Sequence, residues 1–90
     1  MIEDRDTKIK RLRMRSMRRG IKEMDVILSA FADQHLAGLS DDSLAVYDAL
    51  LSENDHDIYG WVTGQAAAPE AYTQIMTDVT ALASGLTRPQ

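Results

Sequence analysis

The chain has 90 residues, 44% of them hydrophobic and none of them cysteine, so it can form one small domain held by apolar packing rather than by disulfides or thiolate-bound zinc. No stretch approaches about 18 consecutive apolar residues and the charged start lacks the apolar core of a signal peptide, so we expect a cytoplasmic domain without membrane insertion. The net charge of −4 is unevenly divided, because residues 1–25 carry nine of the ten Lys and Arg while residues 26–87 carry nine acids and no Lys or Arg; this predicts a charged partner, or attraction within the domain.

The first predicted helix covers residues 7–19, which are rich in Lys, Arg, Leu and Met, all of them good helix formers. Its apolar residues form only a ragged stripe, so we expect this helix to be charged around most of its circumference. Gly20 follows, and glycine commonly ends a helix by taking a left-handed conformation just past the last turn.

The second predicted helix covers residues 21–37, and its apolar residues recur with the spacing i, i+3, i+4, i+7. They are Ile21, Met24, Ile27, Leu28 and Phe31. Gly38 closes this helix, and Ser40 is expected to cap a third helix with two aspartates in its first turn. The buried face of the third helix is predicted to be Leu44, Tyr47, Leu50 and Leu51.

A fourth, short helix is expected after the loop at 52–57, with Asp55 or Asp57 as its cap. Its buried residues are predicted to be Ile58, Trp61 and Val62. Pro69 suits the first turn of a fifth helix, which carries the most regular apolar stripe of the chain. That stripe consists of Tyr72, Ile75, Met76, Val79, Leu82, Ala83 and Leu86. The last residues, 87–90, are expected to fray.

No window alternates with period 2 in strand-forming residues, and no internal repeat is visible. The sequence therefore predicts an all-α fold in which residues 1–90 form a single small domain, a compact bundle of about five helices. Its core is expected to centre on Trp61, Phe31, Leu51 and the stripe from Tyr72 to Leu86.

The sequence holds no signature of catalysis or of metal binding. Its two histidines are His35 and His56, and no HExxH or paired-cysteine pattern accompanies them. We interpret the run at 55–57 as a solvated loop and helix cap, and His35 as solvated or paired with an acid. No GxSxG elbow and no glycine-rich phosphate loop occurs. We therefore expect neither an enzyme nor a bound cofactor.

The basic first helix suggests nucleic-acid binding as one use, because clustered Lys and Arg neutralise phosphates. The chain as a whole is acidic, with a pI near 4.9, whereas a nucleic-acid-binding domain is usually basic. Its few aromatic residues fall mainly on predicted core stripes, and nothing resembles a base-stacking surface. Protein binding is therefore favoured over nucleic-acid binding.

Residues 18–25, RRGIKEMD, hold the densest mixture of both charge signs. One interpretation is a plain turn between helices, with cations at the end of one and Glu23 in the first turn of the next. The other is a docking surface, where Gly20 permits a close approach of a partner's backbone and charged neighbours fix its orientation. The candidate partner-binding residues are Arg18, Arg19, Gly20, Glu23 and Asp25.

The stretch Arg19-Gly20-x-x-Glu23 resembles the RGxxE signature of the succinate dehydrogenase assembly factor 2 family, the bacterial and mitochondrial flavinylation factors. A second block, residues 39–62, is similar to the LSDxE…LL…xDxDLxxWL pattern of that family. The shared elements there are Leu39-Ser40-Asp41, Leu50-Leu51, Asp55, Asp57 and Trp61. The block departs from the pattern at Ser43, where the family often has Glu, and at Val62, where Leu is commoner.

The resemblance implies a small five-helix protein that binds the flavoprotein subunit of succinate dehydrogenase and in some bacteria that of fumarate reductase. We expect the free protein to be a monomer. It further implies that the protein promotes covalent attachment of FAD to a histidine of that subunit, acting as an assembly chaperone. The alternative is a small regulatory protein that binds nucleic acid or a toxin, since some members of the family have been labelled antitoxins.

Overall fold

The computed structural model describes residues 3–87, which form five α-helices and two short 3₁₀ helices and contain no strand. In chain order these are α1 (Arg5–Arg15), α2 (Lys22–His35), η1 (Leu36–Gly38), α3 (Asp41–Leu50), α4 (Asp55–Thr63), η2 (Glu70–Tyr72) and α5 (Thr73–Thr87). The predicted all-α fold is confirmed. Of the predicted frayed end, Thr87 completes α5, and residues 88–90 lie outside the described part.

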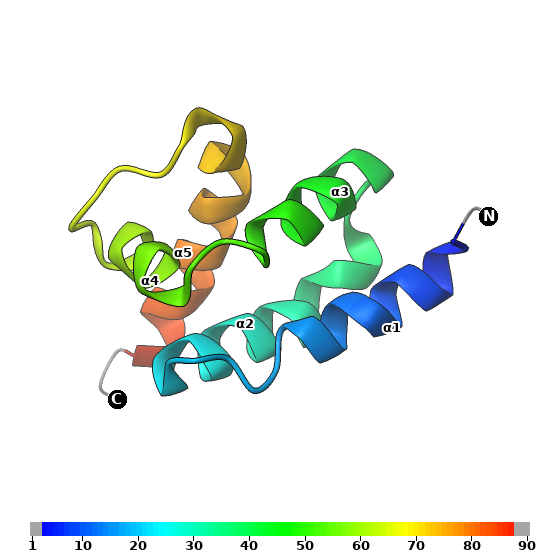
Figure 1. Ribbon diagram of the computed structural model, residues 1–90, viewed down its shortest axis with the longest axis horizontal. Coiled ribbons are helices and arrows are strands. Elements are labelled where there is room, and N and C mark those ends of the chain that lie inside the picture. The colour runs from blue at the N-terminus through cyan, green and yellow to red at the C-terminus, as the bar shows by residue number, and fades with distance from the viewer. Residues whose placement is uncertain (1–2, 88–90) are drawn as a thin grey trace.

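Helix α2 occupies the centre of the molecule, because it packs against α1 on one side and against α4 and α5 on the other. Figure 1 shows α1 and α2 side by side, with α3 alongside them and with α4 and α5 at the opposite end. The segment that joins α1 to α2 therefore lies near the beginning of α4, although the two are more than 30 residues apart in the chain.

The buried residues confirm the apolar stripes predicted for three helices. Helix α2 buries four of its five predicted residues, and α3 together with Leu51 buries all four. Helix α5 buries Ile75, Met76, Val79 and Ala83, whereas Tyr72 and Leu82 are half-buried. The side chain of Leu86 lies outside the described part.

Trp61 does not lie at the centre of the core, and that part of the prediction is wrong. Helix α4 turns Ile58 and Gly60 inward, which leaves Trp61 half-buried at the edge, where its ring centroid is 5.9 Å from that of Tyr72. The centre is formed instead by Phe31 and Tyr47, both fully buried with ring centroids 5.4 Å apart.

Helix α1 ends at Arg15, not at Arg19 as predicted. In a longer helix the backbone N–H of Arg18 would bond to Met14, but it donates to a carboxylate oxygen of Asp25 at 2.9 Å. Arg18 also takes the left-handed conformation, with φ of 55°, whereas Gly20 does not have a positive φ. The helix is thus ended by a contact with α2 and not by the glycine.

The other helix ends follow local chemistry. The hydroxyl of Ser40 accepts the backbone N–H of Ser43 at 3.1 Å, which confirms it as the cap of α3. The cap of α4 is Asn54, whose side-chain oxygen accepts the N–H of His56 at 2.8 Å, so the prediction of an aspartate cap is wrong. Gly64, with φ of 81°, ends α4.

Candidate docking site at the junction of α1 and α2

The junction consists of residues 16–21, between α1 and α2. It begins at a buried pair of hydroxyl groups. Ser16, directly after α1, is fully buried; its hydroxyl donates to the carbonyl of Leu12 at 2.7 Å and lies 2.6 Å from the hydroxyl of Tyr47. Burial raises the pKa of Tyr47 to about 12. On the other side, the hydroxyl of Ser29 in α2 donates to the carbonyl of Ser16 at 3.2 Å. Helices α2 and α3 therefore both hold the start of the junction in place.

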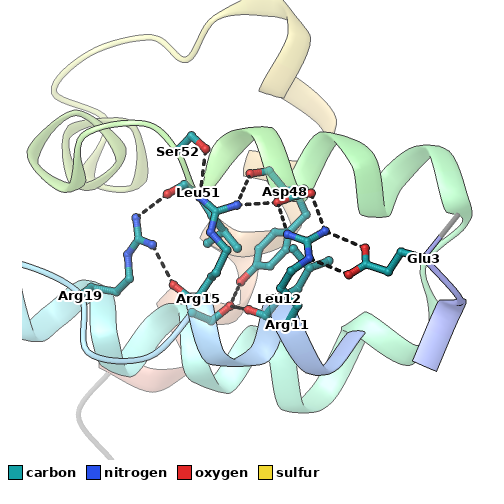
Figure 2. A network of polar contacts seen from close by, with 10 residues as sticks. Glu3, Arg11, Leu12, Arg15, Arg19, Asp48, Leu51 and Ser52 are labelled. Carbon is teal, nitrogen blue, oxygen red and sulfur yellow. Dashed lines mark hydrogen bonds and ion pairs between the residues drawn. The ribbon is translucent and has the colours of Figure 1, made fainter. Parts of the chain in front are cut away.

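Two arginines of α1 form ion pairs with Asp48 of α3, as Figure 2 shows. Arg11 donates to both carboxylate oxygens of Asp48, at 3.0 and 2.8 Å, and Arg15 also donates to this carboxylate and to the hydroxyl of Ser52. The hydrogen bond from Arg11 is the main reason that the pKa of Asp48 lies below its ordinary value. Nearer the N-terminus, Arg5 pairs with Asp41 at 2.8 Å. The predicted attraction between the basic segment and the rest of the domain is confirmed.

Arg19 points inward, and its side chain is only 11% exposed. Its guanidinium donates to the Asp55 carboxylate at 2.9 Å and to two backbone carbonyls, those of Arg15 at 2.8 Å and Leu51 at 3.0 Å. Asp55 is itself only 14% exposed. We predicted Asp55 to be a solvated loop residue or a helix cap, but its carboxylate binds the junction through Arg19. Arg19 joins α1, α3 and α4, and its guanidinium is committed to these contacts.

Gly20 lies against the same carboxylate. Its backbone N–H donates to the second oxygen of Asp55 at 2.6 Å. A Cβ atom added at Gly20 would stand 3.1 Å from that oxygen, closer than ordinary van der Waals contact. The glycine therefore serves a close approach of the chain to Asp55, not the left-handed turn that we predicted.

The five predicted docking residues divide into an inner and an outer group. Arg19 and Asp25 are both half-buried, and Asp25 accepts the N–H of Arg18. The side chains of Arg18 and Glu23 are exposed, and neither makes a hydrogen bond or ion pair with another residue in the range 3–87. Gly20 is exposed between them. Only the outer group is free to contact another molecule.

A shallow hollow of about 300 Å³ lies beside Gly20, lined by Arg15, Met17, Arg18, Arg19, Gly20 and Asp55. Three of these residues, Arg15, Met17 and Asp55, were absent from the predicted site. Met17 is 50% exposed, an unusual position for a large apolar side chain in the middle of a charged run. The sequence signal for Met17 was its place directly before RRG; the pairing of Asp55 with Arg19 across 36 residues had no local signal.

Within residues 3–87, no group of three His, Cys, Asp or Glu side chains could hold a metal ion. The helices in this range are all too short or too polar to cross a membrane. The site combines a backbone held by hydrogen bonds, an open hollow and two free charges of opposite sign, which together are suited to recognising a complementary surface.

Residues 10–83 match the model of a protein family described as the flavinator of succinate dehydrogenase, a range that includes every residue of the site. The chain is 54% identical over 61 residues to the mitochondrial succinate dehydrogenase assembly factor 2 of Meyerozyma guilliermondii, covering 68% of this chain and 45% of that protein. It is 42% identical over 76 residues to the mitochondrial protein of the same name in Danio rerio, covering 82% of this chain and 48% of that one. The chain thus spans about half the length of these relatives.

Proposed function

Because the chain belongs to the family of flavinators of succinate dehydrogenase, we propose that it binds the flavoprotein subunit of that enzyme and promotes covalent attachment of FAD to it. The observation that carries this proposal is the junction of α1 and α2, whose inner residues hold the backbone rigid while Met17, Arg18, Gly20 and Glu23 face outward. We call these four residues the docking surface. The prediction that the chain is not an enzyme agrees with relatives that are named assembly factors.

The internal contacts prepare the docking surface before a partner arrives. The carboxylate of Asp55 holds both the Arg19 side chain and the Gly20 N–H, so part of the backbone freedom of the junction is already lost before binding. Preorganisation of this kind raises affinity, because the cost of ordering has already been met during folding. Gly20 presents no side chain, so a partner's backbone can approach between Arg18 and Glu23.

The proposed mechanism is selection of a conformation. A protein without a catalytic group can accelerate flavin attachment only by binding more tightly to the form of the flavoprotein in which FAD and the acceptor histidine are aligned. Holding two reacting groups in line removes much of the entropic barrier to their reaction. The bond itself would then be formed by groups of the flavoprotein and its FAD.

We also propose that the free protein is a monomer, that it lies in the cytoplasm and that it serves the fumarate reductase flavoprotein as a further client. The relatives reported above are named as mitochondrial proteins. In either location, the proposed function requires that the flavoprotein subunit is present in the same compartment as this chain.

The alternative, a regulatory protein that binds nucleic acid or a toxin, is less well supported by the charges. Arg5, Arg11, Arg15 and Arg19 are engaged with acids of the same chain. The number of cations available for phosphate is therefore smaller than the sequence suggested, and counterion release falls with that number.

Co-purification of a tagged chain with the flavoprotein subunit tests the proposal. We expect the wild type to retain the subunit and Glu23→Gln to lose most of it, because the substitution removes one free charge of the docking surface. Glu70→Gln is the matched control, since Glu70 is an exposed glutamate in η2, outside the docking surface. Retention of the subunit by all three proteins alike would exclude Glu23 from the interface, and its absence from all three would overturn the proposed partner.

A further inference from the structure

Two arginines on the inner face of α1, Arg11 and Arg15, form ion pairs with Asp48 of α3. A second set of cations lies on the outer face of the same helix. Arg11 and Arg15 are half-buried and Leu12 is fully buried, whereas Lys10, Arg13 and Met14 are exposed. Residues three and four apart share one face of a helix. Lys10, Arg13 and Met14 therefore form an outer face of α1, opposite the face that packs against α2 and α3.

This outer face continues directly into the docking surface. Met17 follows Met14 by three residues, just after the end of α1, and it lines the hollow beside Gly20 together with Arg18. We define the outer strip as Lys10, Arg13, Met14, Met17 and Arg18. It combines three cations with two large apolar side chains, of which Met14 is 75% and Met17 50% exposed.

None of the three cations of the outer strip forms an ion pair on the described part of the chain, in contrast to Arg5, Arg11, Arg15 and Arg19. Lys10 attracts the carboxylate of Asp4 only at longer range. Exposed methionines flanked by cations are poorly explained by folding, because the domain gains no burial and no ion pair from them. A complementary surface would carry acids around an apolar depression.

We infer that the interface with the flavoprotein subunit extends from the docking surface along the whole outer strip, with which it shares Met17 and Arg18, and that the strip meets an acidic patch surrounding an apolar depression of that subunit. This inference rests on the proposed function. Methionine side chains are flexible and polarizable, so they adapt to irregular apolar surfaces. The three cations of the outer strip accelerate association with the acidic patch and make the affinity dependent on salt. The two methionines supply the apolar contact that becomes buried in the complex.

A protein surface explains the outer strip better than a lipid bilayer does. Helices that lie in a membrane interface place Trp, Phe or Leu on a broad apolar face. The outer strip has only two methionines, and the aromatic residues lie in α2, α3, α4 and η2. Its apolar part is narrow, which suits a localised depression on a partner protein.

Titration calorimetry of the full chain against the flavoprotein subunit separates the two contributions when it is done at about 50 mM and about 300 mM NaCl. For Lys10→Gln/Arg13→Gln we expect affinity to fall about tenfold at low salt and to depend less on salt than that of the wild type. The matched control is Gln65→Glu/Gln74→Glu, which changes the net charge by the same amount at two exposed glutamines outside α1 and is expected to bind like the wild type.

For Met14→Gln/Met17→Gln we expect affinity to fall about fivefold or more at both salt concentrations, since an apolar contact is not screened. The conservative variant Met14→Leu/Met17→Leu should restore binding to within about twofold of the wild type. Thermal melting of each variant should stay within a few degrees of the wild type, because all these side chains are exposed.

Wild-type affinity for both glutamine variants of the outer strip, together with normal binding by the unsubstituted chain, would overturn this inference and leave the proposed function standing. Failure of the unsubstituted chain to bind would overturn the proposed function, and the inference with it. Co-sedimentation of the chain with phosphatidylglycerol vesicles that is lost in Lys10→Gln/Arg13→Gln would assign the outer strip to lipid instead and contradict the inference.

Discussion

Asp55 is the residue on which the junction depends, since one carboxylate accepts hydrogen bonds from both the Arg19 side chain and the Gly20 backbone. We expect Asp55→Asn to lower the free energy of unfolding by about 2–3 kcal/mol, because it leaves a largely buried guanidinium without its counter-charge. Asp57→Asn is the matched control, an exposed aspartate in the same turn of α4, for which we expect a loss of less than about 1 kcal/mol. Urea denaturation measures both; equal losses would show that Asp55 acts only through the helix dipole.

Two glycines are expected to respond to alanine with opposite signs. Gly20→Ala places a Cβ atom 3.1 Å from Asp55, so the carboxylate must shift and weaken its hydrogen bonds, at a cost of about 1 kcal/mol. Among residues 3–87, a Cβ at Gly38 meets nothing within 4 Å, and its φ is not positive, so Gly38→Ala should stabilise the protein by up to about 1 kcal/mol through the unfolded state. Unfolding free energies that move in the same direction would contradict this reading of Gly20.

Among elements, α1, α2 and α3 are joined by the hydroxyl of Tyr47, which lies 2.6 Å from Ser16 and 3.5 Å from the carbonyl of Leu28. Burial raises the pKa of this hydroxyl to about 12, so the folded state binds its proton more tightly than the unfolded state does. The resulting stability is fully present below about pH 10 and is lost as the pH rises through the folded value.

We therefore expect the wild type to lose stability between about pH 10 and pH 12, and Tyr47→Phe to lose less over the same range. At neutral pH the substitution should cost about 1 kcal/mol, the value of one hydrogen bond. A smaller alkaline slope should persist from Tyr72, whose pKa is also raised, chiefly by its hydrogen bond to Glu53. Urea denaturation across this pH range is the measurement, and identical slopes for the two proteins would show that Tyr47 is not protected.

Helices α2, α3 and α5 could be predicted from sequence because each carries an apolar stripe of helical period, which local residues alone determine. The end of α1 could not be predicted in this way, because it depends on the hydrogen bond that the backbone N–H of Arg18 donates to Asp25 of α2. The same reason applies to Arg19: its motif was visible, but its inward direction follows from Asp55, 36 residues away. The outward positions of Arg18 and Glu23 agree with the docking hypothesis, which stays a prediction.

At the scale of the whole molecule, the division of charge seen in the sequence has two separate consequences. The arginines that face inward pair with acids of α3 and α4 and hold α1 in place. Lys10 and Arg13 are exposed on the outer face of α1, and the exposed Arg18 lines the hollow beside Gly20. In the folded protein, one face of α1 therefore contributes ion pairs to the structure, while its opposite face stays exposed.

If the junction acts on the flavoprotein subunit by docking, the covalent flavin content of that subunit depends on an intact docking surface. In-gel flavin fluorescence would be measured in cells that lack this chain and are supplied with the wild type, Gly20→Arg or Gly38→Arg. The two variants add the same side chain at exposed glycines, one in the docking surface and one at the end of η1. We predict full flavin attachment with the wild type and Gly38→Arg, and loss with Gly20→Arg at a level of folded protein that circular dichroism shows to be comparable. Full attachment with a folded Gly20→Arg protein would contradict the account.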